Sequence, residues 1–235
     1  ASDTTNVNLT VAGSATAGVT GGKAVSVTAG TGLVTVAGDA LTSVTVKGGT
    51  AGATGTSADV TNTVSASGNT GTTLKSVTID GVATGGTFEI AGAAVDTLTV
   101  QNQKVELATA VTNATSTALT VNVDGAGYNS AGTGVAVSVA AGSAAKTITL
   151  NATGTKSSVA VSGAAATTLN ITGTADLALS SPITTATKID GSAATGGLTL
   201  GVLDAATVNV STGAGKDSLT LSATAKATVD RKSVV

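Results

Sequence analysis

The stretch from Ala166 to Asp230 decides the fold, and it reads ATTLNITGTADLALSSPITTATKIDGSAATGGLTLGVLDAATVNVSTGAGKDSLTLSATAKATVD. Aliphatic residues recur in it as pairs with one small residue between them, which is the two-residue period of a β-strand. The pairs are Leu169/Ile171, Leu177/Leu179, Leu198/Leu200, Val208/Val210 and Leu219/Leu221. From Ile148 to Val229 such a strand begins about every ten residues, and the segments between the strands are rich in Gly, Ala, Ser, Thr and Asn, which favour turns.

Two such strands and their connections would make one turn of about twenty residues, which is the scale of a stacked repeat protein. Several phrases also recur, among them LTSVTV from Leu41, LKSVTIDG from Leu74, VDTLTV from Val95 and ATTLNITG from Ala166. The sequence therefore predicts an all-β protein that folds as a parallel β-solenoid, similar to a β-helix or β-roll, with about twenty residues per turn.

The same two-residue period extends toward the N-terminus, and its interruption after residue 50 divides the chain into parts. Residues 1–50 are predicted to hold the first strand repeats, residues 51–72 a loop or boundary with one weak strand at 60–64, and residues 73–235 the main solenoid, in the style of a longer repetitive chain. Phe88 is expected to fill a wide point of the core. The further predicted strand cores are Val7/Leu9/Val11, Val25/Val27, Val34/Val36, Val44/Val46, Val77/Ile79, Phe88/Ile90, Leu98/Val100, Val105/Leu107, Val121/Val123 and Val135/Val137/Val139.

The composition limits how such a protein can bury its surface. The 235 residues include one Phe, one Tyr and no Trp, Met, Cys or His, while Gly occupies 31 positions. Aromatic rings therefore contribute little, and we expect stacked columns of Val, Ile and Leu, each side chain contributing roughly 1.5–3 kcal/mol when fully buried. The hydrophobic content of 41% argues against intrinsic disorder, which combines low hydrophobicity with high net charge.

Charge and residue types exclude several classes of function. The 11 basic and 13 acidic residues are scattered and give a net charge of −2, so the basic stripe of a nucleic-acid-binding protein is missing. No apolar run reaches the roughly 20 residues of a transmembrane helix. Without His or Cys there is no Ser-His-Asp or Cys-His arrangement and no usual zinc site. Glu89 and Glu106 are expected to be solvated, outward-facing residues rather than an acid/base pair, so the sequence predicts no enzyme.

One segment carries a ligand signal, the run TGAGKDSLT from Thr212 to Thr220. It departs at its first position from the calcium-binding repeat G-G-x-G-x-D-x-U-x, and it matches that repeat at Gly213, Gly215, Asp217 and Leu219. The Asp carboxylate and the carbonyls of glycine-rich turns are the hard oxygen ligands that calcium prefers. Gly213, Gly215 and Asp217 are therefore candidate metal-binding residues. The alternative interpretation is a plain turn that leads into the next strand.

A weaker echo of the same repeat lies at residues 124–131, where Gly125, Gly127 and Asn129 fall in register. Asp124 and Asn129 are thus further candidate calcium ligands, again with a simple turn as the alternative. The single Asp residues at other strand ends could complete such sites or form Asx-turns, and they are Asp39, Asp80, Asp190 and Asp204.

Two segments resemble a known family. Residues 165–179, AATTLNITGTADLAL, and residues 212–227, TGAGKDSLTLSATAKA, are similar to the RTX surface-layer proteins that Gram-negative bacteria such as Caulobacter export by type I secretion. The rest of the chain shares composition and rhythm with that family. The resemblance implies a lattice on the outer membrane that is built of β-solenoid turns and held together by calcium. It also implies export through a C-terminal signal, without a cleaved N-terminal leader.

The chain departs from that family's pattern because it has no intact tandem nonapeptides and no recognisable segment that anchors to lipopolysaccharide. Contact with cell-surface lipopolysaccharide would therefore use a segment outside these residues. The function that the resemblance implies is a structural protein of the extracellular bacterial cell surface, whose partners are copies of itself and calcium.

Other classes of function stay open beside this one. The chain could be a stalk or ligand-binding segment of a large secreted adhesin, or an ice-binding solenoid with a flat outward array of Thr and Asn. Thr is also a good strand former on any exposed sheet face, which is the simpler explanation of the array. A polysaccharide lyase or hydrolase would need clustered acids, Arg, Lys or aromatics, which this sequence lacks. The array residues are Thr97, Thr99, Thr147, Thr149, Thr168, Asn170, Thr172, Thr207 and Asn209.

Overall fold

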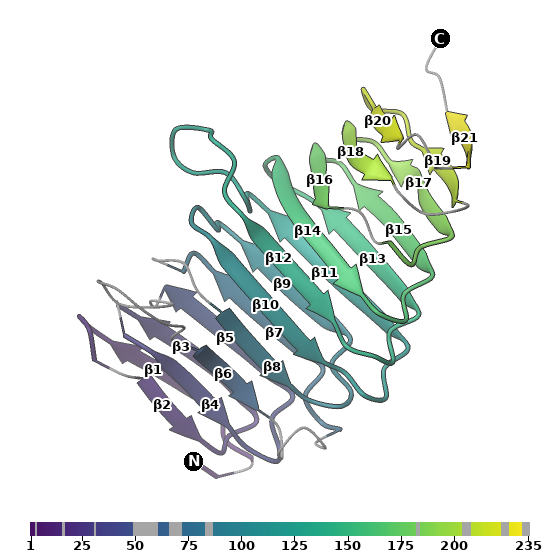
Figure 1. Cartoon of the computed structure of the whole chain (residues 1–235). Coiled ribbons are helices and arrows are strands. Elements are labelled where there is room, and N and C mark those ends of the chain that lie inside the picture. Colours follow the sequence, from purple (N-terminus) through teal and green to yellow (C-terminus); the bar gives the residue numbers. More distant parts are fainter. Residues whose placement is uncertain are drawn as a thin grey trace.

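The chain folds as a β-solenoid in which successive strands alternate between two parallel sheets (Figure 1). The computed structural model describes residues 1–2, 4–15, 17–30, 32–48, 61–65, 72–82, 87–181, 184–203, 208–221 and 226–231. Within these ranges every regular element is a β-strand. The predicted fold class is confirmed, and the turn length of roughly 21 residues agrees with the expected twenty.

Odd-numbered strands belong to sheet A and even-numbered strands to sheet B. In the described chain, sheet A contains β1 (Val7–Val11), β3 (Ala24–Ala29), β5 (Ser43–Gly48), β7 (Ser76–Asp80), β9 (Thr97–Gln101), β11 (Ala118–Asp124), β13 (Thr147–Ala152), β15 (Thr168–Gly173), β17 (Lys188–Ala194), β19 (Val208–Thr212) and β21 (Ala227–Arg231). Sheet B contains β2 (Ala17–Thr20), β4 (Val34–Ala37), β6 (Thr61–Ser65), β8 (Thr87–Ala91), β10 (Leu107–Thr112), β12 (Val137–Ala141), β14 (Ser157–Gly163), β16 (Leu177–Ser181), β18 (Leu198–Leu203) and β20 (Ser218–Leu221).

Each strand pairs in parallel with the strand two positions away in chain order, so every turn of the solenoid lies directly on the turn before it. The register places aliphatic side chains above one another in continuous columns. Along each strand, buried and more exposed residues alternate, as in the pattern of β13 and of β15. One column of sheet A runs through Val7, Val25, Val44, Val77, Leu98, Val121, Leu150 and Ile171.

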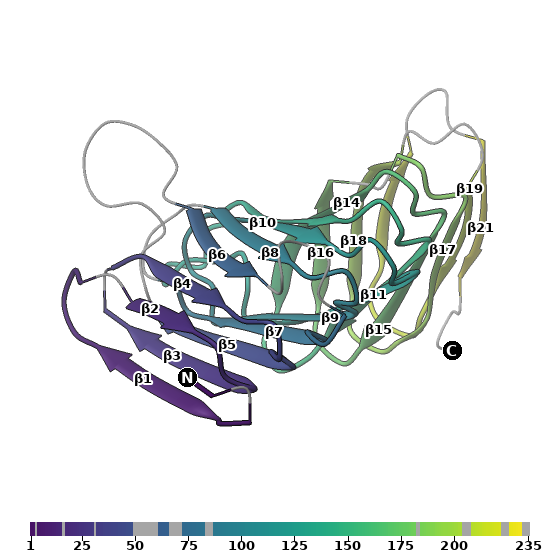
Figure 2. The ribbon, with the colours of Figure 1, turned by 90° about the horizontal axis from the view of Figure 1, so that it is seen from below.

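The core lies between the inner faces of the two sheets and extends along the whole stack. The strand direction rotates progressively from β1 at one end to β21 at the other (Figure 2). This rotation follows from the twist that every pair of neighbouring strands adds. Phe88 lies in this core on β8 with 1% of its surface exposed, which confirms its predicted burial.

The nine strands predicted between Ile148 and Val229 are all present, as β13 to β21. Two strands in the middle of the chain begin later than predicted, so these two predictions are wrong in their first residue. β10 begins at Leu107 and leaves Val105 outside, because the buried Gln103 side chain donates to the Val105 carbonyl (2.9 Å) and accepts from the Val82 amide (3.0 Å). These hydrogen bonds hold the segment before Leu107 as a corner.

The strand predicted at Val135 begins instead at Val137, because the Val135 amide donates to the Gly127 carbonyl (2.9 Å) within a loop. β2 was not predicted at all. It presents Ala17 and Val19 to the core around an exposed Gly18, and this pattern is too short to stand out in the sequence.

Most of residues 51–72, predicted as a loop or boundary, lie outside the described residues. Inside this range the structure describes β6, which coincides with the predicted weak strand at 60–64. β6 pairs with β4 on one side and with β8 on the other, and β5 pairs with β7. The ladders of both sheets therefore continue through this region.

Thr109 occupies a core position of β10 that apolar residues fill in the neighbouring strands. Its register partners are Phe88 and Val139, it is 2% exposed, and its hydroxyl has no hydrogen-bond partner. We expect Thr109→Val to raise the free energy of unfolding by about 1–3 kcal/mol, because it removes a buried unbonded hydroxyl at nearly constant volume. Urea denaturation followed by circular dichroism measures this change.

The control for this substitution is Thr120→Val at a solvent-facing position of β11, where we expect a change within about 0.5 kcal/mol. A Thr109→Val protein that is less stable than the parent would contradict the assignment of this side chain to the apolar core.

No α-helix in the described part of the chain has the length and apolar character needed to cross a bilayer.

Candidate functional site

The five predicted metal-binding residues lie on or beside one edge of the solenoid, which we call the A-to-B corner. This corner is the row of connections that lead from each strand of sheet A to the next strand of sheet B. From β11 onward it comprises residues 125–136, 153–156, 174–176, 195–197 and 213–217. Asp124 ends β11, Asn129 lies in the first of these connections, and Gly213, Gly215 and Asp217 lie in the last.

The structure does not bring the two predicted calcium motifs together. The pair Asp124 and Asn129 follows β11, and the turn with Asp217 follows β19, four strands further along sheet A. Neighbouring strands are about 4.8 Å apart, so the motifs are separated by roughly 19 Å along the stack. The two motifs therefore cannot share an ion within one chain.

Asp124 joins its own turn to the next one. Its Oδ1 accepts hydrogen bonds from the amide of Thr155 (2.9 Å) and from the hydroxyl of the same residue (3.1 Å). Thr155 lies in the following connection of the A-to-B corner. The carboxylate thus satisfies a backbone donor that the turn would otherwise leave open, which is a structural role.

Asn129 uses its side chain inside its own loop. Its Oδ1 accepts from the amides of Ala131 (3.0 Å) and Thr133 (2.9 Å), and Tyr128 pairs with Gly134 in an isolated antiparallel bridge. This arrangement is an Asx-turn that closes a small hairpin. The amide oxygen that was predicted to bind calcium therefore holds the loop together.

Asp217 also bonds across two turns, since its Oδ1 accepts from the amide of Leu198 (2.9 Å) in the preceding turn. Gly213 and Gly215 pack against that same turn. A Cβ at Gly213 would overlap the carbonyl oxygen of Ala194, and a Cβ at Gly215 would overlap that of Gly196. The glycines of the motif are therefore required for close stacking of the backbone.

Asp176 is a further residue of this type that sequence reasoning missed. It precedes β16 as Asp217 precedes β20, and its Oδ1 accepts from the amide of Gly197 (2.7 Å) in the following turn. The signal was present in the sequence as an Asp directly before the Leu177 strand. Its partner is 21 residues away, so the contact becomes visible only once the turns are stacked.

The described residues at Thr212–Thr220 do not form a complete calcium site by themselves. They supply one carboxylate, and the register position opposite Asp217 in the preceding turn is Leu198. Calcium takes six to eight oxygen ligands. Nowhere in the described ranges do three or more acidic, His or Cys side chains gather in a group that could hold a metal ion. The prediction of calcium binding stays a prediction.

Two other aspartates lie on the outer face of sheet A and are held by neighbours. The Ser192 hydroxyl (2.6 Å) and the Lys188 ammonium (2.9 Å) bind Asp190 and lower its pKa to about 2. Partial burial opposes ionisation of Asp80, but hydrogen bonds from Asn102 and Gln101 and the charge of Lys47 outweigh it, so its pKa is lowered. Both carboxylates stabilise the sheet, and Asp204 lies outside the described residues.

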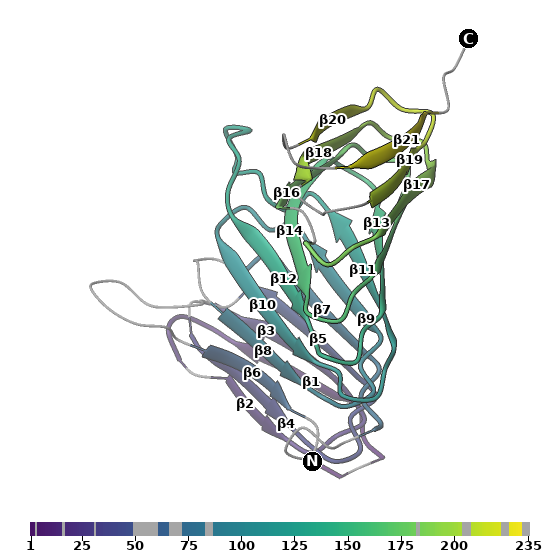
Figure 3. The same cartoon turned by 45° about the vertical axis from the view of Figure 1, so that its right-hand side comes forward.

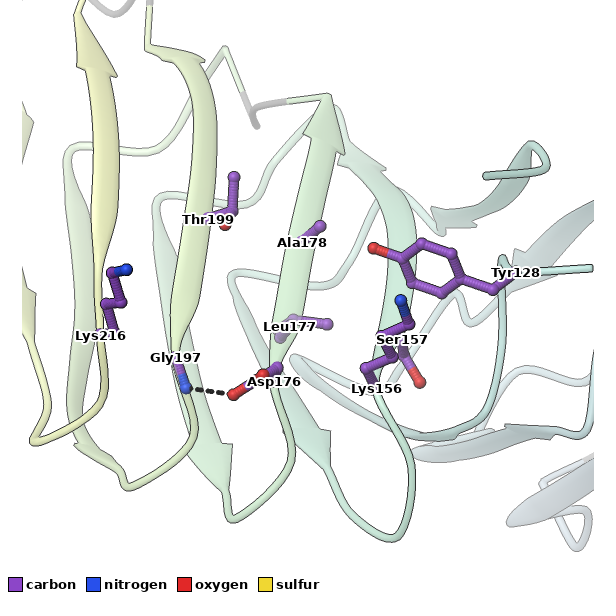
Figure 4. A pocket seen from close by; sticks show the side chains of 9 residues that line it. All are labelled: Tyr128, Lys156, Ser157, Asp176, Leu177, Ala178, Gly197, Thr199 and Lys216. Atoms are coloured by element: carbon purple, nitrogen blue, oxygen red, sulfur yellow. Dashed lines mark hydrogen bonds between the residues drawn. The ribbon is translucent and has the colours of Figure 1, made fainter. Parts of the chain in front are cut away.

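A hollow of 240 Å³ lies on the outer face of sheet B beside the A-to-B corner (Figure 4). Its polar side chains are Tyr128, Lys156, Ser157, Asp176, Thr199 and Lys216. None of them was predicted as a site residue. The sequence signal was the single Tyr of the chain, placed in the turn-forming loop after Asp124, and the two lysines lie 60 residues apart.

Glu89 and Glu106 are both exposed, as predicted, so they do not form a buried pair of carboxylates. Comparison of the chain with protein-family models, with curated proteins and with solved structures finds no match in any of the three.

Proposed function

We propose that this chain is a structural segment of an extracellular bacterial surface layer, in which copies of the solenoid assemble with one another. The observation that supports the proposal best is the open edge of each sheet. Among the described residues, β1, β2, β20 and β21 each have a ladder partner on one side only. An unpaired strand edge carries free backbone donors and acceptors, and it is a template for another strand.

The ends of the apolar columns lie at the same edges. Leu221 on β20 is 42% exposed and Val229 on β21 is 38% exposed, although Val229 continues the buried column through Val210. At the other end, Leu9 is only partly buried. Stacked repeats need polar end caps to stay separate. A further turn, from a second copy or from more of the same chain, would cover these side chains.

The proposal places the protein outside the cell and assigns it no catalytic reaction. Its support is the resemblance of residues 165–179 and 212–227 to RTX surface-layer proteins, together with the solenoid fold that such a lattice would use. Calcium enters the proposal through that resemblance. Because the turn at Asp217 offers one carboxylate, an ion bound there would need further oxygen ligands from backbone carbonyls, from water or from a second copy.

The proposal is tested by following the assembly of the purified chain. We expect the particle size in light scattering to grow with protein concentration, and to grow further on addition of calcium but not of magnesium. Val229→Lys should reduce the association constant at least tenfold, because it places a charge where the next turn would pack, and inward-pointing charges block edge pairing. Circular dichroism of each sample checks that the β-structure is retained.

The matched control is Thr228→Lys, one position earlier on β21 and on the opposite face of the strand, where we expect assembly like that of the parent. If the parent chain stays monomeric at all concentrations with and without calcium, the self-assembly proposal is wrong. The stalk segment of an adhesin would then be the better description of this solenoid.

A second candidate function, ice binding, is favoured by one observation on the outer face of sheet A. Thr97, Thr120, Thr149 and Asn170 lie in direct register on successive strands. A second row through Thr99, Asn122, Asn151 and Thr172 is joined by side-chain hydrogen bonds of 3.4, 3.0 and 3.1 Å.

Five residues of the predicted array lie in these two rows, with rungs about 4.8 Å apart, and they are Thr97, Thr99, Thr149, Asn170 and Thr172. The predicted Thr147, Thr168 and Asn209 lie in another row, which also contains Ala118 and Lys188, and Thr207 lies outside the described residues. A regular array of hydroxyl and amide groups is the kind of surface that could order water. Thermal hysteresis in a freezing assay separates the two candidates, because a surface-layer segment should show none.

A further inference from the structure

The hollow beside Tyr128 lies next to a loop that the regular turns of the solenoid lack. It arises because one turn is longer than its neighbours. Val121 and Leu150 are register partners 29 residues apart, whereas Ile148 and Leu169 are partners 21 residues apart. The extra residues form the loop at 125–136, which projects from the stack (Figure 3).

This loop is fixed in position by contacts to the solenoid. The Gly127 amide donates to the Gln103 carbonyl (2.9 Å), and a Cβ at Gly127, whose φ is +84°, would overlap the carbonyl oxygen of Ser158. The Asx-turn at Asn129 and the bridge between Tyr128 and Gly134 close the loop. The ring of Tyr128 is therefore held beside the outer face of sheet B without help from a ligand.

Positive charge lies on two sides of the hollow. The Lys156 ammonium is 4.3 Å from the centroid of the Tyr128 ring, and Lys216 lies at the opposite side (Figure 4). Asp176 lies between them, and its Oδ1 accepts from the Gly197 amide. Among the lining side chains two cations face one anion, so the hollow attracts negative charge.

The floor of the hollow is made of small residues. Ala178 and Thr199 are register partners on β16 and β18, and Gly197 precedes β18. The missing side-chain volume at Ala178 and Gly197 opens the space, and the Thr199 hydroxyl offers a donor and an acceptor. The volume of 240 Å³ is below the usual range for drug-sized ligands, and it suits one sugar ring with its neighbour extending along the surface.

We propose that this hollow binds an acidic polysaccharide through a uronic acid residue. The sugar ring packs beside the Tyr128 side chain, one face of which the Lys156 ammonium covers. The sugar hydroxyls bond to Thr199 and Asp176, and carboxylates on the occupied residue and its neighbour pair with Lys156 and Lys216. Strands in register place the two lysines three strands apart, roughly 14 Å, so a short oligosaccharide and not a single sugar reaches both.

The test uses the tyrosine itself as the reporter, because Tyr128 is the only Tyr and the chain has no Trp. The fluorescence of the parent protein is titrated with trigalacturonate, with galacturonate monomer and with maltotriose as a neutral oligosaccharide. We expect a saturable change with trigalacturonate, binding at least tenfold weaker for the monomer, and no binding of maltotriose. Raising the salt concentration should weaken trigalacturonate binding, since the lysines are exposed.

Lys216→Ala is expected to weaken trigalacturonate binding about tenfold, which corresponds to the loss of one charge-assisted hydrogen bond. The matched control is Lys146→Ala, an exposed lysine at the opposite edge of the stack, which should bind like the parent. Tyr128→Phe keeps the ring and should retain binding as read by calorimetry, while Tyr128→Ala should lose it.

Equal affinity for maltotriose would overturn the acidic specificity. Equal affinity for the monomer would overturn the assignment to a polysaccharide and leave a site for a free acidic sugar. An equal loss of trigalacturonate affinity in Lys216→Ala and Lys146→Ala would show that binding depends on the overall positive charge and does not take place in this hollow.

Discussion

Phe88→Ala is expected to lower the free energy of unfolding by about 3–5 kcal/mol, the cost of removing a fully buried aromatic ring from a packed core. Phe88 is the only Phe of the chain and is 1% exposed on the inner face of β8. The neighbouring position in register on β10 is Thr109, whose short side chain cannot expand to fill the space. Denaturation by urea, followed by circular dichroism, measures the loss.

The control for this large effect is the adjacent residue. Glu89 lies on the outer face of the same strand, so Glu89→Ala should change the free energy of unfolding by less than about 0.5 kcal/mol. A Phe88→Ala protein that loses less than about 1 kcal/mol would mean that the two sheets close over the cavity, which rigidly stacked turns should prevent.

The second large effect is expected at Gly173, which ends β15. Its φ is +108°, and a Cβ there would overlap the carbonyl oxygen of Ala152 in the preceding turn. Gly173→Ala should therefore combine backbone strain of roughly 1–2 kcal/mol with overpacking of roughly 1–3 kcal/mol. We expect a total destabilisation of about 2–5 kcal/mol, measured by thermal and urea denaturation.

Substitutions at three other glycines distinguish backbone strain from steric overlap as the cause of the destabilisation. Gly213 has the steric overlap without a positive φ, Gly13 has a φ of +68° with open space around it, and Gly18 has neither. The expected order of destabilisation on substitution by Ala is Gly173, then Gly213, then Gly13, with Gly18 neutral or slightly stabilised because Ala restricts the unfolded chain. If Gly213→Ala were as mild as Gly18→Ala, the close stacking of the turn at Asp217 would be wrong.

The candidate site shows where sequence reasoning reached its limit. The sequence predicts either a calcium-binding repeat or a plain turn from Thr212 to Thr220, and the structure shows stacking contacts for its residues. Asp217 bonds to Leu198, 19 residues earlier, and the glycines admit the carbonyls of the preceding turn. A calcium motif and a stacking motif use the same residues, because both need a carboxylate and glycines at a tight corner. The local pattern alone cannot distinguish them.

The shift of β10 has a comparable cause. Val105 and Leu107 fit the two-residue period of a strand as well as Leu107 and Thr109 do. Hydrophobicity favours Val105 and Leu107 as the buried pair, because both are aliphatic and Thr109 is polar. The buried Gln103 decides the matter by bonding to Val105 and to Val82, which is 21 residues away. Thr109 is then brought into the core with its hydroxyl unbonded.

The sequence by itself determined most of the strands, the turn length and the all-β solenoid, because the alternation of aliphatic and small residues is a local property of each strand. Only the tertiary structure decided which side chains meet: Asp124 with Thr155, Asp176 with Gly197, and Tyr128 with Lys156. The partners lie about one turn apart in the chain, and the turns vary in length. The separations are 31, 21 and 28 residues, so these contacts follow from the register between stacked turns and not from any fixed spacing in the sequence.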